Sequence, residues 1–477
     1  MKRFARVNLP VLVLVLAFAM AATAQEYVPD EIIVKGATDA QLAALGGVGI
    51  KSSSLLTVQS GAQLVTLKEG LDPRVAAALL SALPNVEYAS PNYILTINVV
   101  PNDPRYSQQW GWPKTDAPAA WDITTGDPTV VIGVIDTGVQ LNHPDLEANI
   151  WVNQAELNGL AGVDDDGNGH IDDIYGYNPI NNSYNPNDNN GHGTHCAGTI
   201  GAVTDNGIGV AGAAWQVGIM ALKFLDAGGS GTTANAIKCI DYAIATKNAG
   251  SANVVALSNS WGGVGGSPAL TSAIQRARDA EIVFVAAAGN ESFNLDSSAC
   301  VMSPGGLSVS NLVSVAATDS GDGLSYFSNY GSSLVHVGAP GSSIMSTYTN
   351  SGYSSLSGTS MACPHVAGAF ALVAAVDPTL TMDELIDRVL LNVDPIPALN
   401  GKTKTGGRLN YYRAVANDPN PAYNPDRDGD GIWNHRDNCP YVANPDQNDS
   451  SNDGVGNACP GPNTPCPGLG CLGAPGL

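Results

Sequence analysis

Residues 130–139 read VVIGVIDTGV, and this stretch carries the strongest indication of the fold. It is rich in β-branched residues, as strands are, and the apolar run stops at Asp136. Similar runs follow at intervals, with helical patterns between them (strands at 217–225, 253–261, 282–289 and 312–318; helices at 194–203, 233–247 and 269–280). This alternation predicts an α/β fold, a mostly parallel twisted sheet with helices on both faces. Asp136 would lie at the carboxyl end of its strand, the edge at which such sheets bind their ligands.

The composition limits which functions are possible. The 477 residues include 43 acidic and 21 basic ones, so the net charge is −22 and nucleic-acid binding, which needs a basic surface, is not expected. Hydrophobic residues make up 44% of the chain, enough for a sizeable core. The 54 glycines and 30 prolines suit a large fold with many tight turns better than a coiled coil.

The two ends of the chain differ from its centre. Residues 1–24 join basic residues, an apolar run and a small-x-small cleavage site, which is the layout of a secretory signal peptide. We therefore expect a secreted protein with no stable membrane insertion after signal removal. Residues 25–100 show a small α+β pattern, and residues 101–417 hold the alternating strands and helices. From 418 to 477 the composition changes to Asp, Asn, Pro, Gly and Cys, which marks a separate tail.

Three short motifs contain residues suited to nucleophilic catalysis. They are VIDTGV (134–139) with Asp136, HGTHCAG (192–198) with His192, and GTSMACPHVAG (358–368) with Ser360. Each has an ordinary structural explanation when taken alone, because Asp and Ser often cap helices and His often bonds a carbonyl. Together they supply a nucleophile, a base and an orienting acid, which a serine hydroxyl needs in order to react.

In their order along the chain, these motifs resemble those of the subtilisin-like serine proteases (subtilases), over residues 104–416. The resemblance implies that Ser360 is the nucleophile, His192 the general base and Asp136 the group that orients it. It also implies that Asn290, in AAAGNE (286–291), donates its amide to the oxyanion. The protein would be a serine endopeptidase that acts on polypeptides through an acyl-enzyme.

The same resemblance implies a substrate site and an inhibitor. Two strand ends, SWGG (260–263) and AAAG (286–289), would wall the pocket for the residue before the scissile bond, through Ser260, Trp261, Gly262, Gly263, Ala287, Ala288 and Gly289. Trp261 is larger than the usual residue there, and its ring could pack outward or narrow a subsite. Residues 25–100 resemble an inhibitory propeptide, the enzyme's own intramolecular inhibitor, although an independent accessory domain stays open. A broad or hydrophobic preference is the default expectation, since no acidic cluster is evident around the pocket.

An acidic loop, VDDDGNGHIDD (163–173), lies between Asp136 and His192. Its spacing matches the first half of an EF-hand loop, with oxygen ligands at alternate positions and a glycine at the sharp turn. Position 12 of the pattern is Tyr175 in place of Glu, so Asp173 would substitute. The expected Ca²⁺ ligands are Asp164, Asp166, Asn168, His170, Asp172 and Asp173. A solvated acidic loop is the alternative.

The tail contains a more complete loop of this kind, DRDGDGIWNHRDNCP (426–440). The expected ligands are Asp426, Asp428, Asp430, Ile432, Asn434 and Asp437. The segment resembles thrombospondin type 3 repeats, with a second, weaker site after it. With few apolar residues, the tail would depend on Ca²⁺ and a Cys439–Cys459 disulfide, and Cys466 could pair with Cys471.

Other functions would also explain parts of this sequence. A calcium-dependent adhesion or matrix-binding protein with a retired protease domain would explain the tail, but the intact catalytic set opposes it. A highly selective processing protease stays open. Cys196 and Cys363 neighbour the catalytic motifs and are expected to be free, buried thiols, because the motif places Ser360 at the nucleophile's position. We expect a monomer.

Overall fold

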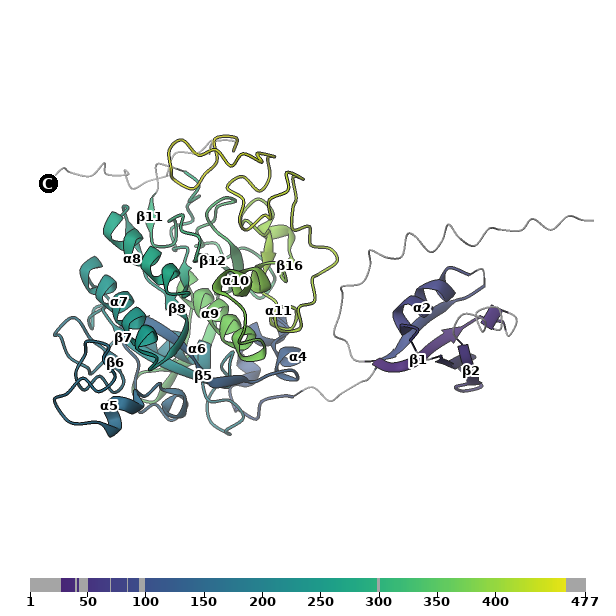
Figure 1. Ribbon diagram of the computed structural model, residues 1–477, viewed down its shortest axis with the longest axis horizontal. Helices are drawn as coiled ribbons and strands as arrows, with labels where there is room; N and C mark the ends of the chain where they lie inside the picture. Colours follow the sequence, from purple (N-terminus) through teal and green to yellow (C-terminus); the bar gives the residue numbers. More distant parts are fainter. Residues whose placement is uncertain are drawn as a thin grey trace, which may run out of the picture. The chain divides into compact units, whose positions relative to one another are not determined.

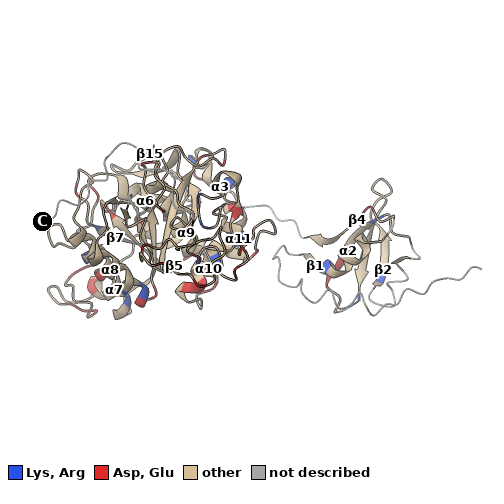
Figure 2. Cartoon of the chain, turned by 90° about the horizontal axis from the view of Figure 1, so that it is seen from above, with Lys and Arg blue, Asp and Glu red and all other residues tan. Residues whose placement is uncertain are grey.

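The computed structural model describes residues 27–459, apart from 39–40, 43–49, 69, 84, 94–98 and 298–300. The predicted signal peptide, Cys300 and the Cys466–Cys471 pair therefore lie outside the described residues. The chain forms two compact units, Met1–Asn98 and Val99–Leu477. Charged side chains are sparse on both (Figure 2), as the 13% charged content requires.

The larger unit is built on a nine-stranded sheet with the order β16-β17-β13-β12-β10-β8-β5-β7-β6 among the described residues. Neighbours from β13 to β6 pair in parallel, and β16 pairs antiparallel with β17. This confirms the predicted mostly parallel α/β fold. The strands are β5 (Gly126–Asp136), β6 (Gly176–Tyr177), β7 (Gln216–Lys223), β8 (Asn253–Asn259), β10 (Val283–Ala287), β12 (Leu312–Thr318), β13 (Val337–Pro340), β16 (Asp394–Pro395) and β17 (Gly407–Arg408).

Helices cover both faces of this sheet (Figure 1). One face packs against α6 (His192–Gly201), α9 (Thr359–Val376), α10 (Met382–Leu390) and α11 (Tyr411–Ala416). The other face packs against α7 (Thr233–Ala249) and α8 (Pro268–Asp279). The central strand β5 contributes to both cores, because successive side chains of a strand point to opposite faces: Val134 lies in the first core and Ile135 in the second.

Helix α9 is long and apolar enough to cross a membrane by length and composition, with a mean hydropathy of 1.5 over 18 residues. However, 83% of this segment is buried inside the protein. A helix that is apolar all round belongs in the middle of a large core. Its apolarity therefore reflects its central place in the core.

Shorter elements form the edges of the larger unit. They are α3 (Gly111–Lys114), α4 (Ala117–Trp121), α5 (Gln154–Asn158), the antiparallel pair β9 (Gly263–Val264) with β11 (Met302–Ser303), and the hairpin β14 (Ile344–Tyr348) with β15 (Gly352–Leu356). The pairing of β9 with β11 matters for the site, since it joins two segments that are far apart in the sequence.

The N-terminal unit is a small α+β fold, as predicted. Its antiparallel sheet has the order β2-β3-β1-β4, with β1 (Tyr27–Lys35), β2 (Ile50–Leu55), β3 (Ala62–Leu67) and β4 (Tyr88–Tyr93). Helix α2 (Pro73–Ser81) starts at Asp72, whose side chain accepts from the backbone N–H of Arg74. Ile32, Val65 and Leu80 are almost completely buried between the sheet and this helix.

The described part of the tail packs against earlier residues of the chain within one unit. The buried Lys404 ammonium donates to the backbone carbonyl of Asp437 at 2.9 Å, and the His435 ring bonds Asp387 of α10 at 2.7 Å. The predicted Cys439–Cys459 disulfide is present. The change of composition after residue 417 coincides with the end of α11, but these contacts continue across it.

Candidate active site

Asp136 and His192 meet at the carboxyl end of the sheet. Asp136 is the last residue of β5 and is 1% exposed, and His192 is the first residue of α6. The Nδ1 atom of His192 lies 2.8 Å from Oδ1 and 3.0 Å from Oδ2 of Asp136. Burial disfavours a charged imidazole, but the charge and the hydrogen bond of Asp136 outweigh it and raise the pKa of His192 above its usual value.

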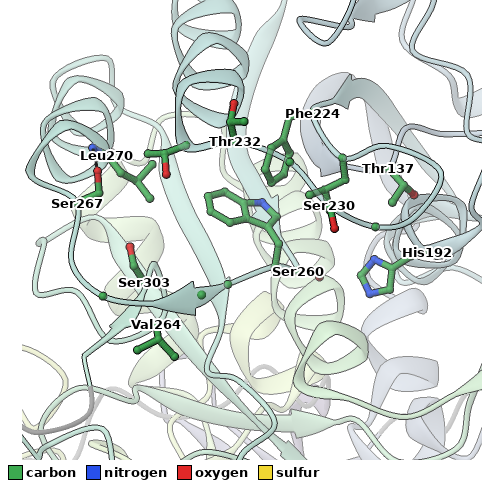
Figure 3. A pocket seen from close by; sticks show the side chains of 18 of the residues that line it. Thr137, His192, Phe224, Ser230, Thr232, Ser260, Val264, Ser267, Leu270 and Ser303 are labelled. Atoms are coloured by element: carbon green, nitrogen blue, oxygen red, sulfur yellow. Dashed lines mark hydrogen bonds between the residues drawn. The ribbon is translucent and has the colours of Figure 1, made fainter. Parts of the chain in front are cut away.

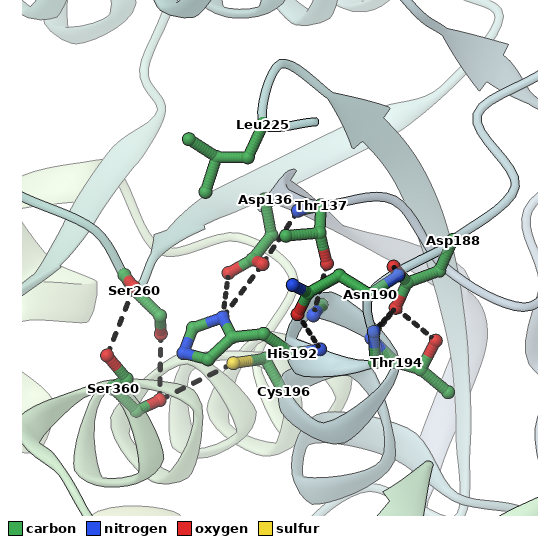
Figure 4. Close-up of polar contacts among 12 residues, drawn as sticks. Asp136, Thr137, Asp188, Asn190, His192, Thr194, Cys196, Leu225, Ser260 and Ser360 are labelled. Atoms are coloured by element: carbon green, nitrogen blue, oxygen red, sulfur yellow. Dashed lines mark hydrogen bonds and ion pairs between the residues drawn. The ribbon is translucent and has the colours of Figure 1, made fainter. Parts of the chain in front are cut away.

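Ser360 lies on the other side of the imidazole ring (Figure 4). It is the second residue of α9, and its hydroxyl donates to the backbone carbonyl of Ser260 at 3.1 Å. The Ser260 hydroxyl in turn donates to the carbonyl of Ser360 at 2.8 Å. The structure thus places the three predicted residues in one cluster, although they come from β5, α6 and α9.

The cysteines beside this cluster are free and buried, as expected. The Cys196 thiol lies 3.5 Å from the carbonyl oxygen of Ser360. Burial raises the pKa of Cys363 to about 11, so this thiol stays protonated at neutral pH. Because the thiolate is the reactive form, Cys363 is unsuited to act as a nucleophile.

Asn290 follows β10 and is held in one orientation. Its Oδ1 atom accepts from the backbone N–H of Thr359 at 2.8 Å and from the Thr359 hydroxyl at 3.0 Å. Its amide N–H groups are therefore left for another partner. Asn290 and Ser360 both line a small cavity.

All the predicted substrate residues border one of two adjoining cavities. The larger one, about 540 Å³, includes Ser260 and Gly263 together with residues 229–233 (Figure 3). The smaller one, about 120 Å³, includes Ala287, Ala288 and Gly289. Trp261 and Gly262 border both.

Trp261 borders both cavities. Its ring packs edge-to-face on Phe224 with the ring centroids 4.8 Å apart, and it also packs against the core on the α7 and α8 side of the sheet.

Five further residues that border the small cavity were missed by the sequence reasoning: Glu291, Met302, Ser303, Gly305 and Thr359. Glu291 directly follows Asn290, so its position in the motif was the available signal. Met302 had none, since only the pairing of β11 with β9 brings it to the site.

The acidic loop 163–173 is only partly arranged as predicted. Carboxylate oxygens of Asp166 and Asp173 lie within 4.8 Å of each other and of Glu156, a residue of α5 that the sequence reasoning missed. Asp173 is fully buried, and burial raises its pKa to about 6. Asn168 donates to Asp173 at 2.9 Å.

The remaining predicted ligands of this loop have other contacts. Asp164 accepts from the backbone N–H groups of Gly167 and Gly169, and Asp172 accepts from that of Gly162. The His170 ring packs against tyrosine rings, with centroids 4.9 Å from both Tyr177 and Tyr242. A cation held here would take Asp166, Asp173 and Glu156 as its carboxylate ligands.

The tail loop offers oxygen atoms that lack partners. Carboxylate oxygens of Asp426, Asp428 and Asp430 lie within 4.8 Å of one another. Asp428 and Asp437 each keep one buried oxygen without a hydrogen-bond partner among the described residues, and burial raises the pKa of both. Such a set of hard oxygen atoms fits Ca²⁺.

The other two predicted ligands of the tail loop, Ile432 and Asn434, each donate one hydrogen bond near the loop. Asn434 donates its amide to the carbonyl of Asn424 at 2.6 Å. The backbone N–H of Ile432 donates to Asp430 at 2.9 Å. Both contacts shape the turn around the three aspartates.

A further pair of buried carboxylates, Asp103 and Asp145, was also missed. Burial raises the pKa of Asp145 to about 6, and one oxygen of Asp103 has no partner among the described residues. Their sequence surroundings carry no dense acidic pattern, because tertiary folding alone brings the two segments together.

Known proteins resemble this chain over the same segments. Residues 127–415 match the Subtilase family, residues 16–92 the Fervidolysin N-terminal prodomain, and residues 422–447 the Thrombospondin type 3 repeat. Thermitase from Thermoactinomyces vulgaris is 39% identical over 316 residues, which are 66% of this chain and 99% of thermitase. The thermophilic serine proteinase of Bacillus sp. (strain AK1) is 38% identical over 342 residues, 71% of this chain and 75% of that protein. A solved protease structure from Pseudoalteromonas arctica matches with 32% identity and a TM-score of 0.52, over 67% of this chain and 99% of that one.

Proposed function

The chain belongs to the subtilase family and is a serine endopeptidase, and we propose that Ser360, His192 and Asp136 carry its chemistry. The observation that supports this most is the hydrogen bond from His192 to Asp136 on one side of the imidazole, with Ser360 on the other. The intact set opposes a retired protease domain that serves only in adhesion.

In the proposed reaction, the Ser360 hydroxyl turns from the Ser260 carbonyl to the Nε2 atom of His192 and attacks the scissile carbonyl carbon. Its proton passes to Nε2, and Asp136 stabilises the resulting imidazolium. His192 then gives this proton to the leaving amine nitrogen as the C–N bond breaks. A water molecule cleaves the acyl ester by the same route and restores the Ser360 hydroxyl.

Asn290 and the backbone N–H of Ser360 would stabilise the oxyanion that forms during each attack. The support for Asn290 is its fixed amide: Thr359 occupies its oxygen atom, and its N–H groups remain available beside Ser360. A donor that is held before the reaction costs no reorganisation when the negative charge develops.

The substrate would bind as an extended strand along residues 229–232 and 260–263, which border the larger cavity. Main-chain hydrogen bonds would then give affinity for any polypeptide, while the pockets give selectivity. The substrates are therefore polypeptides, and the propeptide would occupy the same cleft before maturation.

We further propose how the precursor is organised. Residues 1–24 would direct secretion, 25–100 would inhibit the enzyme until cleavage, 101–417 would form the catalytic domain and 418–477 the tail. The support is the signal-peptide pattern of the first residues together with the prodomain match over 16–92. The mature protein would be a monomer outside the cell.

Calcium would stabilise this enzyme at two loops. The carboxylates of Asp426, Asp428 and Asp430, together with the unpartnered oxygen of Asp437, would hold one ion in the tail, and those of Glu156, Asp166 and Asp173 would hold another in the catalytic region. The ion would supply positive charge that offsets repulsion among these clustered carboxylates. Its contribution would be to stability, since neither cluster includes a proposed catalytic residue.

The substitution Ser360→Ala tests the catalytic proposal. Purified S360A should cleave no casein and should remain an uncut precursor, because self-cleavage needs the same nucleophile. N-terminal sequencing of the wild-type enzyme should find a new terminus between residues 93 and 106. Maturation and casein cleavage by S360A at the wild-type rate would refute the assignment of the nucleophile.

A further inference from the structure

Asn290 lies in an exposed loop, although a donor to the oxyanion must be held in one place. Asn290 and the next residue, Glu291, are both exposed. Thr359 holds the Oδ1 atom of Asn290 through contacts of 2.8 and 3.0 Å, but these contacts fix the side chain and not the backbone that carries it. Exposed loops are more mobile than the strands and helices they join. The loop therefore needs a further anchor at its backbone.

The buried side chain of Asn329 contacts this backbone both before and after Asn290. Its Nδ2 atom donates to the carbonyl of Ala288 at 2.9 Å, and its Oδ1 atom accepts from the backbone N–H groups of Glu291 at 3.1 Å and Phe293 at 2.8 Å. Asn329 is 0% exposed. Breaking these hydrogen bonds would be costly, because no water could replace the lost partners of a buried amide.

The remaining polar groups of Asn329 are directed to the same loop. Its second Nδ2 proton goes to the Glu291 carboxylate at 2.7 Å, and its backbone N–H donates to the carbonyl of Gly289 at 2.9 Å. Gly289 has a φ of +105°, and a Cβ atom there would lie 2.3 Å from the Asn329 amide nitrogen. An asparagine side chain has two donor and two acceptor positions, and here all four serve residues 288–293.

The segment that carries Asn329 is itself attached to the core sheet. It lies between β12 and β13, and the hydroxyl of Ser328 accepts from the backbone N–H of Ala317 in β12 at 2.9 Å. On the other side, the backbone N–H of Tyr330 donates to the carbonyl of Phe293 at 2.9 Å. The anchor therefore connects the exposed loop to a buried strand.

We propose that Asn329 is a positioning residue for the oxyanion site, because it fixes the backbone on both sides of Asn290 and so aims the Asn290 amide at the attacked carbonyl. Asn329 touches neither the substrate nor the reacting atoms and acts only through Asn290. The inference rests on the proposed function, since it requires that Asn290 donates to the oxyanion.

The test measures kcat and KM of the mature N329A enzyme on one short peptide. Without the carboxamide the loop loses its anchor, and a misplacement of about 1 Å can cost about 10²-fold in rate. We expect kcat to fall by about tenfold to 100-fold and KM to change little, because the oxyanion forms only near the transition state. N329D is the second variant. It keeps the shape and the acceptor oxygen of Asn329 but loses both N–H donors and repels Glu291, so its kcat should also fall.

A double-mutant cycle separates positioning from a general loss of stability. N329A should lower kcat by less than about twofold when it is added to N290A, because the donor that Asn329 positions is then already absent. Asn311 provides the matched control: it is also 0% exposed, and its amide donates to the carbonyls of Ile274 and Ile282 at 3.2 and 2.9 Å. It directly precedes β12, at the end of the strand away from the site. N311A should lose stability and keep the wild-type kcat.

Wild-type kcat in both N329A and N329D would overturn the inference. So would a double variant in which the losses caused by N329A and N290A multiply, because Asn329 would then act independently of Asn290. In both cases a low kcat of N290A alone would leave the proposed function intact. A wild-type kcat in N290A alone would instead refute the oxyanion role of Asn290, and the inference would fail with it.

Discussion

The catalytic centre and the tail both bury carboxylates, but they satisfy them differently. Both oxygens of Asp136 lie within hydrogen-bond distance of the His192 ring, and one also accepts from the backbone N–H of Thr137 at 2.7 Å. In the tail, Asp428 and Asp437 each retain a buried oxygen without a partner in the described part of the chain.

This difference separates what the catalytic geometry requires from what the stability of the tail requires. A buried charge is stable only when hydrogen bonds or an opposite charge compensate it. The protein's own donors compensate Asp136, so the catalytic geometry needs no ion. In the described part of the tail, donors reach one oxygen of Asp428 and one of Asp437 but not the other, and the cation proposed there would stabilise the fold without taking part in the reaction.

The substitution Asp136→Asn should have the largest effect, a loss of about 10⁴-fold in kcat. The amide cannot stabilise the imidazolium, and it favours the wrong tautomer of His192. Because Asp136 raises the pKa of His192, the acid limb of the wild-type pH–rate profile should lie above pH 6.5, and that of D136N should move to lower pH. A D136N enzyme with unchanged kcat would remove Asp136 from the mechanism.

The substitution Asn290→Ala should lower kcat by about 10²–10³-fold with little change in KM. The oxyanion exists only near the transition state, so its donor should not affect ground-state binding. Steady-state kinetics on one peptide measure kcat and KM separately. A change confined to KM would show that Asn290 contacts the bound substrate instead.

Calcium should raise the melting temperature of the full chain through the tail loop. At a calcium concentration 100 times the dissociation constant, binding adds about 2.7 kcal/mol to the free energy of unfolding. Thermal unfolding with calcium and with chelator should show this shift in wild type and a smaller shift in D437N. Asp446→Asn, an exposed tail residue outside the cluster, is the matched control and should retain the full shift.

If D437N kept the wild-type calcium shift, the tail loop would not be the stabilising site. The kcat of folded D437N on a small peptide should equal that of wild type, since the catalytic centre is complete without the ion. A large loss of kcat in correctly folded D437N would contradict the separation of the two regions.

The smallest effect should come from Asp173 in the loop 163–173. Burial raises its folded-state pKa from 3.8 to about 6, so the folded chain binds this proton more tightly than the unfolded chain. In chelator, the Asp173 contribution to the free energy of unfolding should therefore fall as the pH rises from about 4 to about 6. Denaturant unfolding measured across this pH range should show that the free energy of unfolding falls less in D173N than in wild type. An identical pH dependence in D173N and wild type would contradict the raised pKa.

The sequence predicted the parts of the site that lie in local patterns. Asp136, His192 and Ser360 each sit in a short motif, and the order of the motifs indicated the family before any contact was known. The acidic loops were recognised by their spacing. In the loop 163–173, however, only Asp166 and Asp173 converge with Glu156, because spacing alone does not say which carboxylates turn toward backbone N–H groups.

The sequence by itself determined the α/β fold, the chemistry of the centre and the disulfide of the tail. Apolar runs specify strands, and the reactive residues lie in short motifs that can be recognised from the residues beside them in the chain. Only the tertiary structure decided that Met302 borders the small cavity and that the tail packs against Lys404 and Asp387. These features depend on the distances between segments that are remote in sequence, and packing of the whole core sets those distances.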